Sequence, residues 1–318
     1  MRILFGIQLT GNGHINRSLR LIYELRKLGH TVDICVSGSG ASINSVEYQY
    51  RFRGYSIYPN NSGGVNWIKT IFKTNPIKVI IDSIKLKTSK YDLVVSDFEP
   101  VSVLSSFLHS TKCITICNQN EILNKRFNIF RKLFIKIFTL RSKRLSYSYN
   151  PENQDSYLPI ISEKVCNGQS YDAGFNLVYL PYLDTNRIYK EIVKYGKGNW
   201  KIYTKDVIKS EFKNIKICKT DTTTFTKDLL SCRGIITASG FSTTSEALIL
   251  GKKLWSIPLK GQFEQKFNSG ELSKFGIFNL HFNSENIKLW IDKYTSIHYK
   301  WSDPTWDIIK KIELYAEN

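Results

Sequence analysis

Hydrophobic residues near the N-terminus form two short apolar runs separated by a stretch with helical spacing. The runs at residues 2–8 and 32–36 predict strands, and the apolar positions that recur between residues 15 and 25 predict a helix that Gly29 ends. Glycines at residues 11–13 predict a tight turn before that helix. The pattern is that of a βαβ unit, in which the two strands run parallel.

The same alternation returns in the C-terminal half. Apolar runs at residues 234–238 and 253–259 predict strands, with a helix at about 243–250 between them and another from about residue 265. Further apolar runs of strand length, interspersed with stretches of helical spacing, occur in both halves of the chain. We therefore expect an α/β fold of parallel sheets, in which polar residues that follow the strands share one sheet edge.

Length and local composition favour two domains. The chain has 318 residues, enough for two domains of ordinary size. A polar stretch with prolines at about 150–170 resembles a linker, so we expect domains at 1–165 and 166–300, and a terminal helix within 301–318 that crosses back to the first. No apolar run reaches the roughly 18 residues that span a bilayer, and the chain opens with a strand. These features predict a cytoplasmic protein without a signal peptide.

Net charge, cysteine spacing and glycine spacing limit which ligands and cofactors the chain is expected to bind. The formal net charge of +18 at pH 7 attracts phosphates, on a nucleotide sugar, an anionic lipid or a nucleic acid. The six cysteines show no metal-ligand spacing, which favours reduced thiols over zinc or disulfides. A dinucleotide fingerprint is incomplete, because Asn16 replaces its third glycine and no acidic residue ends the second strand. An NAD cofactor is therefore disfavoured.

One polar cluster follows the strand predicted at 234–238. Hydroxyls and the N–H groups of a helix N-terminus suit an anion such as a diphosphate, and Glu246, one turn later, suits a ribose diol. The members of the cluster are Ser239, Gly240, Phe241, Ser242 and Thr243. The segment 243–246 is also a capping box, in which Glu246 would serve only its own helix.

A second polar cluster follows the strand predicted at 253–259. Gln262, Glu264 and Gln265 offer the donors and acceptors that bind a sugar, although a solvated turn would have the same composition.

Together the two clusters resemble the donor signature of GT-B glycosyltransferases. The pattern S-G-x-x-[ST]-x-x-E-A, followed by P-x-x-x-x-x-[DE]-Q-x-x-N, is similar to that of the MurG-like family and of the UDP-glycosyltransferases. The resemblance implies two Rossmann-like domains facing each other across a cleft. The donor contacts it implies are Gly240 and Thr243 for the phosphates, Glu246 for the ribose, Glu264, Gln265 and Asn268 for the sugar, and Phe225 or Thr226 for the nucleobase. Ala238 departs from the plant-type enzymes, which have a phosphate-binding histidine there.

The N-terminal segment Gly-His-Ile-Asn resembles the start of the same enzymes, whose plant-type members use the histidine as general base. The resemblance implies that His14 is the base, that Asp97 at the end of a predicted strand orients it, and that Gly11, Asn12 and Gly13 line the acceptor side. The helix dipole would keep His14 neutral and able to accept a proton. A structural histidine and a helix-capping aspartate remain the alternatives.

Two basic amphipathic stretches occur in the N-terminal half. In the first, at residues 65–86, lysines are interspersed among the apolar residues Trp67, Ile68, Ile71 and Phe72. Residues 119–145 place apolar positions opposite Lys and Arg, which predicts one long basic helix at about 120–145. Each stretch is either a helix packed on the core with a solvated outer face or a membrane surface, and for residues 65–86 an acceptor face is a further alternative.

The interpretation that joins these features is an inverting, metal-independent glycosyltransferase of the hexosyltransferase class. It would move a sugar from a nucleotide diphosphate donor, with UDP favoured by the resemblance, to a hydroxyl of a glycan or lipid-linked acceptor. No cofactor or metal is expected, and attachment to the inner face of a membrane is open. An epimerase or hydrolase of the same fold, using Glu99 and Glu264, is one alternative. A basic nucleic-acid-binding or DNA-glycosylating protein is another.

Overall fold

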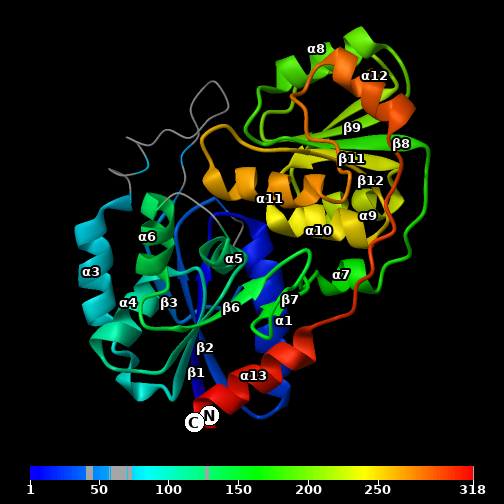
Figure 1. Cartoon of the computed structure of the whole chain (residues 1–318). Helices are drawn as coiled ribbons and strands as arrows, with labels where there is room; N and C mark the ends of the chain where they lie inside the picture. Colours follow the sequence, from blue (N-terminus) through cyan, green and yellow to red (C-terminus); the bar gives the residue numbers. More distant parts are fainter. Residues whose placement is uncertain (41–45, 57, 59–69, 71–73, 126–128, 318) are drawn as a thin grey trace. The chain divides into compact units, whose positions relative to one another are not determined.

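The chain forms two compact units, each built on its own sheet (Figure 1). The computed structural model describes residues 1–40, 46–56, 58, 70, 74–125 and 129–317. Among these, the first unit contains the residues up to Tyr58, those from Thr70 to Ile160 and those from Ser302 onward, and the second contains Ile161 to Trp301. The chain therefore returns to the first unit with its last segment.

The first unit contains a parallel sheet of seven strands among the described residues, in the order β3-β2-β1-β4-β5-β6-β7. The strands are β1 (Arg2–Gln8), β2 (Thr31–Ser37), β3 (Tyr50–Phe52), β4 (Leu93–Asp97), β5 (Cys113–Ile116), β6 (Lys143–Tyr147) and β7 (Ser156–Tyr157). The central strands β1 and β4 are buried along almost their whole length. Continuous apolar runs of this kind are typical of parallel strands covered on both faces.

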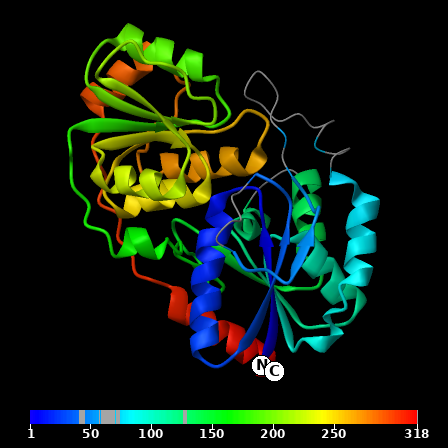
Figure 2. The same ribbon diagram turned by 180° about the vertical axis from the view of Figure 1, so that it is seen from behind.

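Helices cover both faces of this sheet, because the crossovers through α1 (Asn12–Lys27) and α4 (Pro100–Leu108) run in opposite directions from its centre. The last helix, α13 (Thr305–Glu317), packs against α1, as Figure 2 shows from behind. Arg20 and His30 pair there with Asp303 and Glu313. The remaining helical segments are α3 (Pro76–Lys85), a short 3-10 turn at Thr88–Lys90, α5 (Gln119–Asn124) and α6 (Ile129–Phe138).

The second unit repeats the arrangement with a five-stranded parallel sheet in the order β10-β9-β8-β11-β12. The strands are β8 (Phe175–Tyr179), β9 (Asn199–Thr204), β10 (Ile215–Lys219), β11 (Gly234–Ala238) and β12 (Lys253–Ile257). The helices are α7 (Glu163–Cys166), α8 (Thr185–Tyr195), α9 (Thr222–Ser231), α10 (Phe241–Ile249), α11 (Phe263–Ser273) and α12 (Ser284–Lys293). When the strands are numbered from 1 within each unit, both sheets contain the strand order 3-2-1-4-5. The predicted α/β fold with two Rossmann-like domains is confirmed.

Two local predictions were wrong. The long basic helix at 120–145 is absent: α5 ends at Asn124, α6 is a separate helix, and the last part is strand β6. The glycines at 11–13 do not form a separate turn, because α1 begins at Asn12 with Gly11 as its N-cap. The helix predicted at about 243–250 is confirmed as α10, which begins at Phe241 and ends at Ile249.

The stretch predicted as amphipathic at 65–86 is described only in part. Its apolar group of Trp67, Ile68, Ile71 and Phe72 lies outside the described residues, and its C-terminal part forms α3.

Close packing of α4 on β1 depends on Gly6. A methyl group at this position would collide with the Ser102 hydroxyl and lie 3.2 Å from Cβ of Glu99. We expect Gly6→Ala to lower the free energy of unfolding by roughly 1–3 kcal/mol, because overpacking displaces the helix. Urea unfolding measures this loss. Gly270→Ala is the matched control, since nothing lies near the added methyl group. Equal stability of the two variants would show that α4 does not need this close contact.

Candidate active site

The first candidate site lies at the carboxyl end of the central strands β1 and β4. Strand order reverses between these neighbours, and α/β proteins bind ligands at such points. β1 leads into α1, whose first turn contains His14, and β4 ends at Asp97. Residues far apart in the sequence therefore meet at one edge of the sheet.

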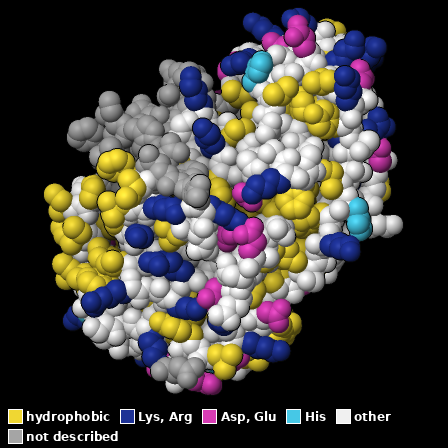
Figure 3. Space-filling view, in the orientation of Figure 1, with side chains coloured by type: hydrophobic (Ala, Val, Ile, Leu, Met, Phe, Trp, Pro, Cys, Tyr) yellow, Lys and Arg dark blue, Asp and Glu magenta, His cyan; other side chains and the backbone are white. Residues whose placement is uncertain are grey.

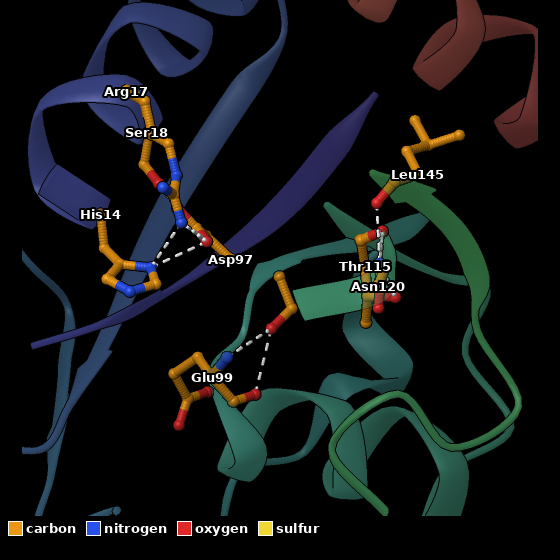
Figure 4. Close-up of polar contacts among 9 residues, drawn as sticks. His14, Arg17, Ser18, Asp97, Glu99, Thr115, Asn120 and Leu145 are labelled. Carbon is orange, nitrogen blue, oxygen red and sulfur yellow. Dashed lines mark hydrogen bonds and ion pairs between the residues drawn. The ribbon is translucent and has the colours of Figure 1, made fainter. Parts of the chain in front are cut away.

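His14, Arg17 and Asp97 form one hydrogen-bonded group (Figure 4). His14 Nδ1 lies 2.9 Å from Asp97 Oδ1. Arg17 donates to both carboxylate oxygens, through Nη2 to Oδ1 and Nε to Oδ2, each at 2.6 Å. Ser18 Oγ adds a bond of 3.2 Å to Oδ2. The carboxylate is thus saturated with donors, and the alternative role of Asp97 as a helix cap is not observed.

Asp97 remains charged although it is buried. Burial alone would raise the pKa of this carboxyl, but the charges of Arg17 and His14 and the hydrogen bonds from both outweigh it and hold the pKa at about 2. Burial likewise opposes the charge of Arg17, yet Asp97 raises the pKa of the guanidinium above its usual value. The two side chains form a buried ion pair beside His14.

Arg17 also influences which nitrogen of His14 carries the proton. Its Nη2 lies 2.8 Å from His14 Nδ1, the same atom that faces Asp97. A protonated Nδ1 donates to Asp97, which leaves Nε2 with a lone pair that can accept a proton. A bare Nδ1 instead accepts from Arg17. The histidine can therefore act as a base through Nε2 when Asp97 holds the Nδ1 proton.

The residues after Asp97 turn sharply. Phe98 has a left-handed backbone with φ of 56°, which is uncommon for a residue with a side chain and is found at functional sites. Glu99 then caps α4 by accepting from the N–H groups of Val101 and Ser102. Its carboxylate is fully buried and also accepts from Ser37. The acid–base role that the epimerase alternative gave to Glu99 does not fit a buried helix cap.

A cavity of about 380 Å³ lies beside this edge in the first unit. It is polar and basic and is located where β2 and β3 end. The lining residues are Gly38, Ser39, Arg51, Phe52, Arg53, Ser56 and Tyr58. Gly11, Asn12 and Gly13, predicted to line the acceptor side, are half-buried around the start of α1 and do not line this cavity.

The second candidate site lies at the corresponding edge of the second unit, after β11. Gly240 is the N-cap of α10 and has no side chain with which to cap the helix. The first N–H groups of an α-helix have no partner within the helix, so an uncapped end suits an anion. Ser242 and Thr243 are half-buried there, and Phe241 is buried. The hydroxyl of Ser239 is fully buried and bonds Ser256 Oγ at 2.7 Å instead.

Glu246 does not form the capping box that the sequence left open. Its Oε1 accepts a hydrogen bond of 3.0 Å from Ser162 Oγ, and burial raises the pKa of the carboxyl while Ser162 opposes the rise. Oε2 makes no hydrogen bond within the described residues. One oxygen is thus held by the protein, and the other remains for a ligand such as a ribose diol.

The polar cluster after β12 divides into supporting and open residues. Gln265 Oε1 accepts from the Leu259 N–H at 2.8 Å, and Asn268 Nδ2 donates to the Ser239 carbonyl at 3.0 Å. These two bonds hold the loops that follow β12 and β11. By contrast, Gln262 Oε1 is buried without a hydrogen-bond partner among the described residues. Buried acceptors are normally paired, so this atom is able to accept a hydrogen bond from a ligand donor.

The other residues predicted to bind the donor are Glu264, Phe225 and Thr226. Glu264 is half-buried and close enough to Tyr182 to raise the pKa of that phenol, after the larger effect of burial. Phe225 packs against Tyr179 and Tyr203, with ring centroids 5.1 and 5.2 Å apart. The hydroxyl of Thr226 bonds the carbonyl of Thr222 within α9. An aromatic cluster therefore lies at the carboxyl ends of β8 and β9 and includes Phe225, for which the resemblance implied a nucleobase contact.

Comparison with known proteins places the chain in a family. The family model described as glycosyl transferase family 1 matches residues 1–294. The chain belongs to glycosyl transferase family 1. It is therefore a glycosyltransferase, as the sequence predicted. A search of curated proteins found no match.

Solved structures share the fold of this glycosyltransferase. Arabidopsis thaliana UGT89C1 complexed with UDP-L-rhamnose has a TM-score of 0.67 and 14% identity, over 99% of this chain and 98% of that one. The glycosyltransferase SnogD from Streptomyces nogalater has a TM-score of 0.56 and 14% identity, over 100% and 95%. A Listeria monocytogenes protein described as a UDP-N-acetylglucosamine 2-epimerase has a TM-score of 0.61 and 10% identity, over 100% and 96%. These likenesses identify the GT-B fold.

Sequence reasoning missed two residues that shape the sites of this glycosyltransferase. Arg17 lies three positions after His14, on the same side of α1, and this spacing was the available signal. Ser162 lies far from Glu246 in the sequence, and no local pattern connects the two. No group of His, Cys, Asp or Glu able to hold a metal occurs within the described part of the glycosyltransferase.

The lowered pKa of Asp97 predicts how stability depends on pH. Its contribution to the free energy of unfolding, about 2 kcal/mol, is present above its unfolded pKa near 4 and is lost as pH falls through about 2. We expect the stability difference between wild type and Asp97→Asn to shrink by about this amount between about pH 5 and pH 2, in urea unfolding. Asp172→Asn, which breaks an exposed pair with Arg233, should show a smaller change. A constant difference for Asp97→Asn would contradict the ionised state.

Proposed function

We propose that the protein is an inverting, metal-independent hexosyltransferase that moves a sugar from a nucleotide diphosphate donor to an acceptor hydroxyl. The observation that carries this proposal is the contact of 2.9 Å between His14 and Asp97, whose pKa is lowered to about 2. Asp97 favours a proton on Nδ1 and stabilises the imidazolium that forms when Nε2 takes a second one. The position of Asp97 therefore supports the assignment of His14 as the base that deprotonates the acceptor hydroxyl.

The reaction follows as a single displacement. His14 Nε2 takes the proton of the acceptor hydroxyl while the oxygen forms a bond to the anomeric carbon of the donor. The bond from that carbon to the diphosphate oxygen breaks, and the diphosphate leaves with the electron pair. Attack from the side opposite the leaving group inverts the anomeric centre. The uncapped N-terminus of α10 would stabilise the added negative charge, which is why no metal is required.

We assign the donor to the second unit. The end of α10 would bind the diphosphate, Oε2 of Glu246 the ribose, and Gln262 a sugar hydroxyl. The aromatic cluster of Phe225, Tyr179 and Tyr203 would lie against the base. UDP is favoured because the similar Arabidopsis UGT89C1 was crystallised with UDP and with UDP-L-rhamnose.

We assign the acceptor to the first unit, next to His14. The basic cavity lined by Arg51 and Arg53 favours an acceptor that also carries an anionic group. A glycan or a lipid-linked sugar with a phosphate or carboxylate would meet this condition.

Nucleotide binding tests the donor assignment. We expect UDP at about 1 mM to raise the melting temperature of the wild type by several degrees, since a ligand at 100 times its dissociation constant adds about 2.7 kcal/mol. GDP, ADP, dTDP and NAD serve as competing candidates in the same thermal unfolding assay. Glu246→Ala should respond much less. Glu285→Ala, which removes an exposed carboxylate from α12, should respond like the wild type. An equal response of Glu246→Ala would remove the assignment of the ribose site.

Asp97→Asn tests the base assignment. We expect kcat for release of UDP from the sugar donor to fall by roughly 100- to 10,000-fold, because the amide no longer favours the Nδ1 proton or stabilises the imidazolium. UDP binding should be unchanged, since the nucleotide is assigned to the other unit. Ser18→Ala removes only the neutral hydrogen bond to Asp97 and should retain most of the activity. A folded Asp97→Asn variant with more than about a tenth of the wild-type kcat would exclude this role.

A further inference from the structure

Helix α3 presents its apolar side to solvent. Ile77, Ile80, Ile81 and Ile84 have the spacing of a core-facing stripe, yet their exposed fractions range from 41% to 70%. The buried residues of α3 include Asp82 and Ser83, both polar. The helix packs against α4, and its amphipathic pattern is therefore inverted relative to an ordinary surface helix.

Helix α6 also exposes apolar residues to solvent, although its inner side is apolar as well. Ile129, Phe130, Leu133 and Ile137 are 56% to 77% exposed, although the sequence pattern made them candidates for the core. The side of α6 that faces the protein contains Ile135 and Phe138, which are buried. A core helix with a solvated basic face, the simpler alternative for this stretch, is wrong for α6.

The two exposed stripes belong to one region of the first unit. Both helices pack against α4, and Figures 1 and 2 show them side by side. Figure 3 shows hydrophobic side chains gathered on the left, over the place of α3 and α6 in Figure 1. The apolar face is defined by Ile77, Ile80, Ile81, Ile84, Ile129, Phe130, Leu133 and Ile137. Contiguous patches of this kind usually mark an interaction site.

Charge around the apolar face has one sign. Lys78, Lys85 and Lys136 are exposed on the two helices, and Arg141 is exposed just beyond α6. In α3 and α6, described throughout except for the Arg131 side chain, the single acidic residue is Asp82, which is buried against Lys78. A second copy of the chain would bring two basic surfaces together, which disfavours self-association.

We propose that the apolar face docks on an anionic lipid bilayer. Isoleucine, leucine and phenylalanine would enter the boundary between headgroups and acyl chains, while the surrounding lysines contact the lipid phosphates. None of the described helices is long and apolar enough to cross a bilayer, so the contact is interfacial. This proposal does not depend on the sugar-transfer reaction.

Vesicle sedimentation with the full chain tests the proposal. The wild type is expected to bind phosphatidylcholine vesicles that contain about one-third phosphatidylglycerol, and to bind pure phosphatidylcholine at least tenfold more weakly. Lys85→Gln and Lys136→Gln should each weaken binding to the anionic vesicles by roughly fivefold. Equal binding to both vesicle types would overturn the electrostatic part of the proposal.

A matched pair of variants tests the apolar part. Ile84→Asp with Ile137→Asp places two charges on the apolar face and should reduce vesicle binding by roughly tenfold or more. Tyr171→Asp with Val207→Asp adds the same charge at comparably exposed positions of the second unit and serves as the control. All four residues are exposed, so both variants should retain the wild-type melting temperature.

Three results would overturn the proposal. In the first, the wild type does not sediment with anionic vesicles. In the second, both double variants lose vesicle binding equally. In the third, the wild type is a dimer, and the double substitution Ile84→Asp with Ile137→Asp converts it to a monomer. The last result would identify the apolar face as a contact between copies of the chain. A nucleotide-binding failure with intact vesicle binding would affect only the proposed function.

Discussion

The buried ion pair between Asp97 and Arg17 is the interaction on which the first site depends. Two ions removed from water cost several kcal/mol each, and only good geometry offsets that cost. Here the guanidinium contacts both carboxylate oxygens at 2.6 Å. Because Arg17 belongs to α1 and Asp97 to β4, the pair fixes the first turn of the helix against the centre of the sheet. The position of His14 is thereby coupled to the folding of the unit.

The two units use one topology to make different sites. In both, a helix begins at the carboxyl end of a central parallel strand, where its N-terminus is available to a ligand. In the first unit, His14 and Arg17 fill the start of that helix with side chains bonded to Asp97. In the second unit, Gly240 occupies the N-cap position and offers no side chain to cap the helix. The proposed base and the proposed anion site thus follow the two central strands of similar sheets, strand β1 in the first unit and strand β11, the counterpart of β4, in the second.

The sequence predicted the fold and the meeting of His14 with Asp97, because buried parallel strands have strong apolar runs and their carboxyl ends share an edge. It did not predict Arg17, since an arginine on a helix is usually solvated, and its burial depends on a partner from another strand. Glu246 stayed ambiguous for the same reason, as Ser162 comes from a distant segment. Periodicity also shows that a helix has an apolar side without showing which side faces the core. The exposure of apolar residues on α3 and α6 was therefore not predicted.

Helix α6 connects the sheet edge that contains Asp97 with the apolar face. Its inner side places Phe138 against Phe98, with ring centroids 4.8 Å apart, and Phe98 directly follows Asp97 in a left-handed conformation. Tyr55 packs on the same Phe138 at 5.5 Å. A bilayer that holds the outer side of α6 would therefore restrain the segment that carries Asp97. It would also confine an acceptor anchored in the lipid to the surface on which the first unit lies. Confinement of two reactants to one surface raises their effective concentration without any new contact at the reacting atoms.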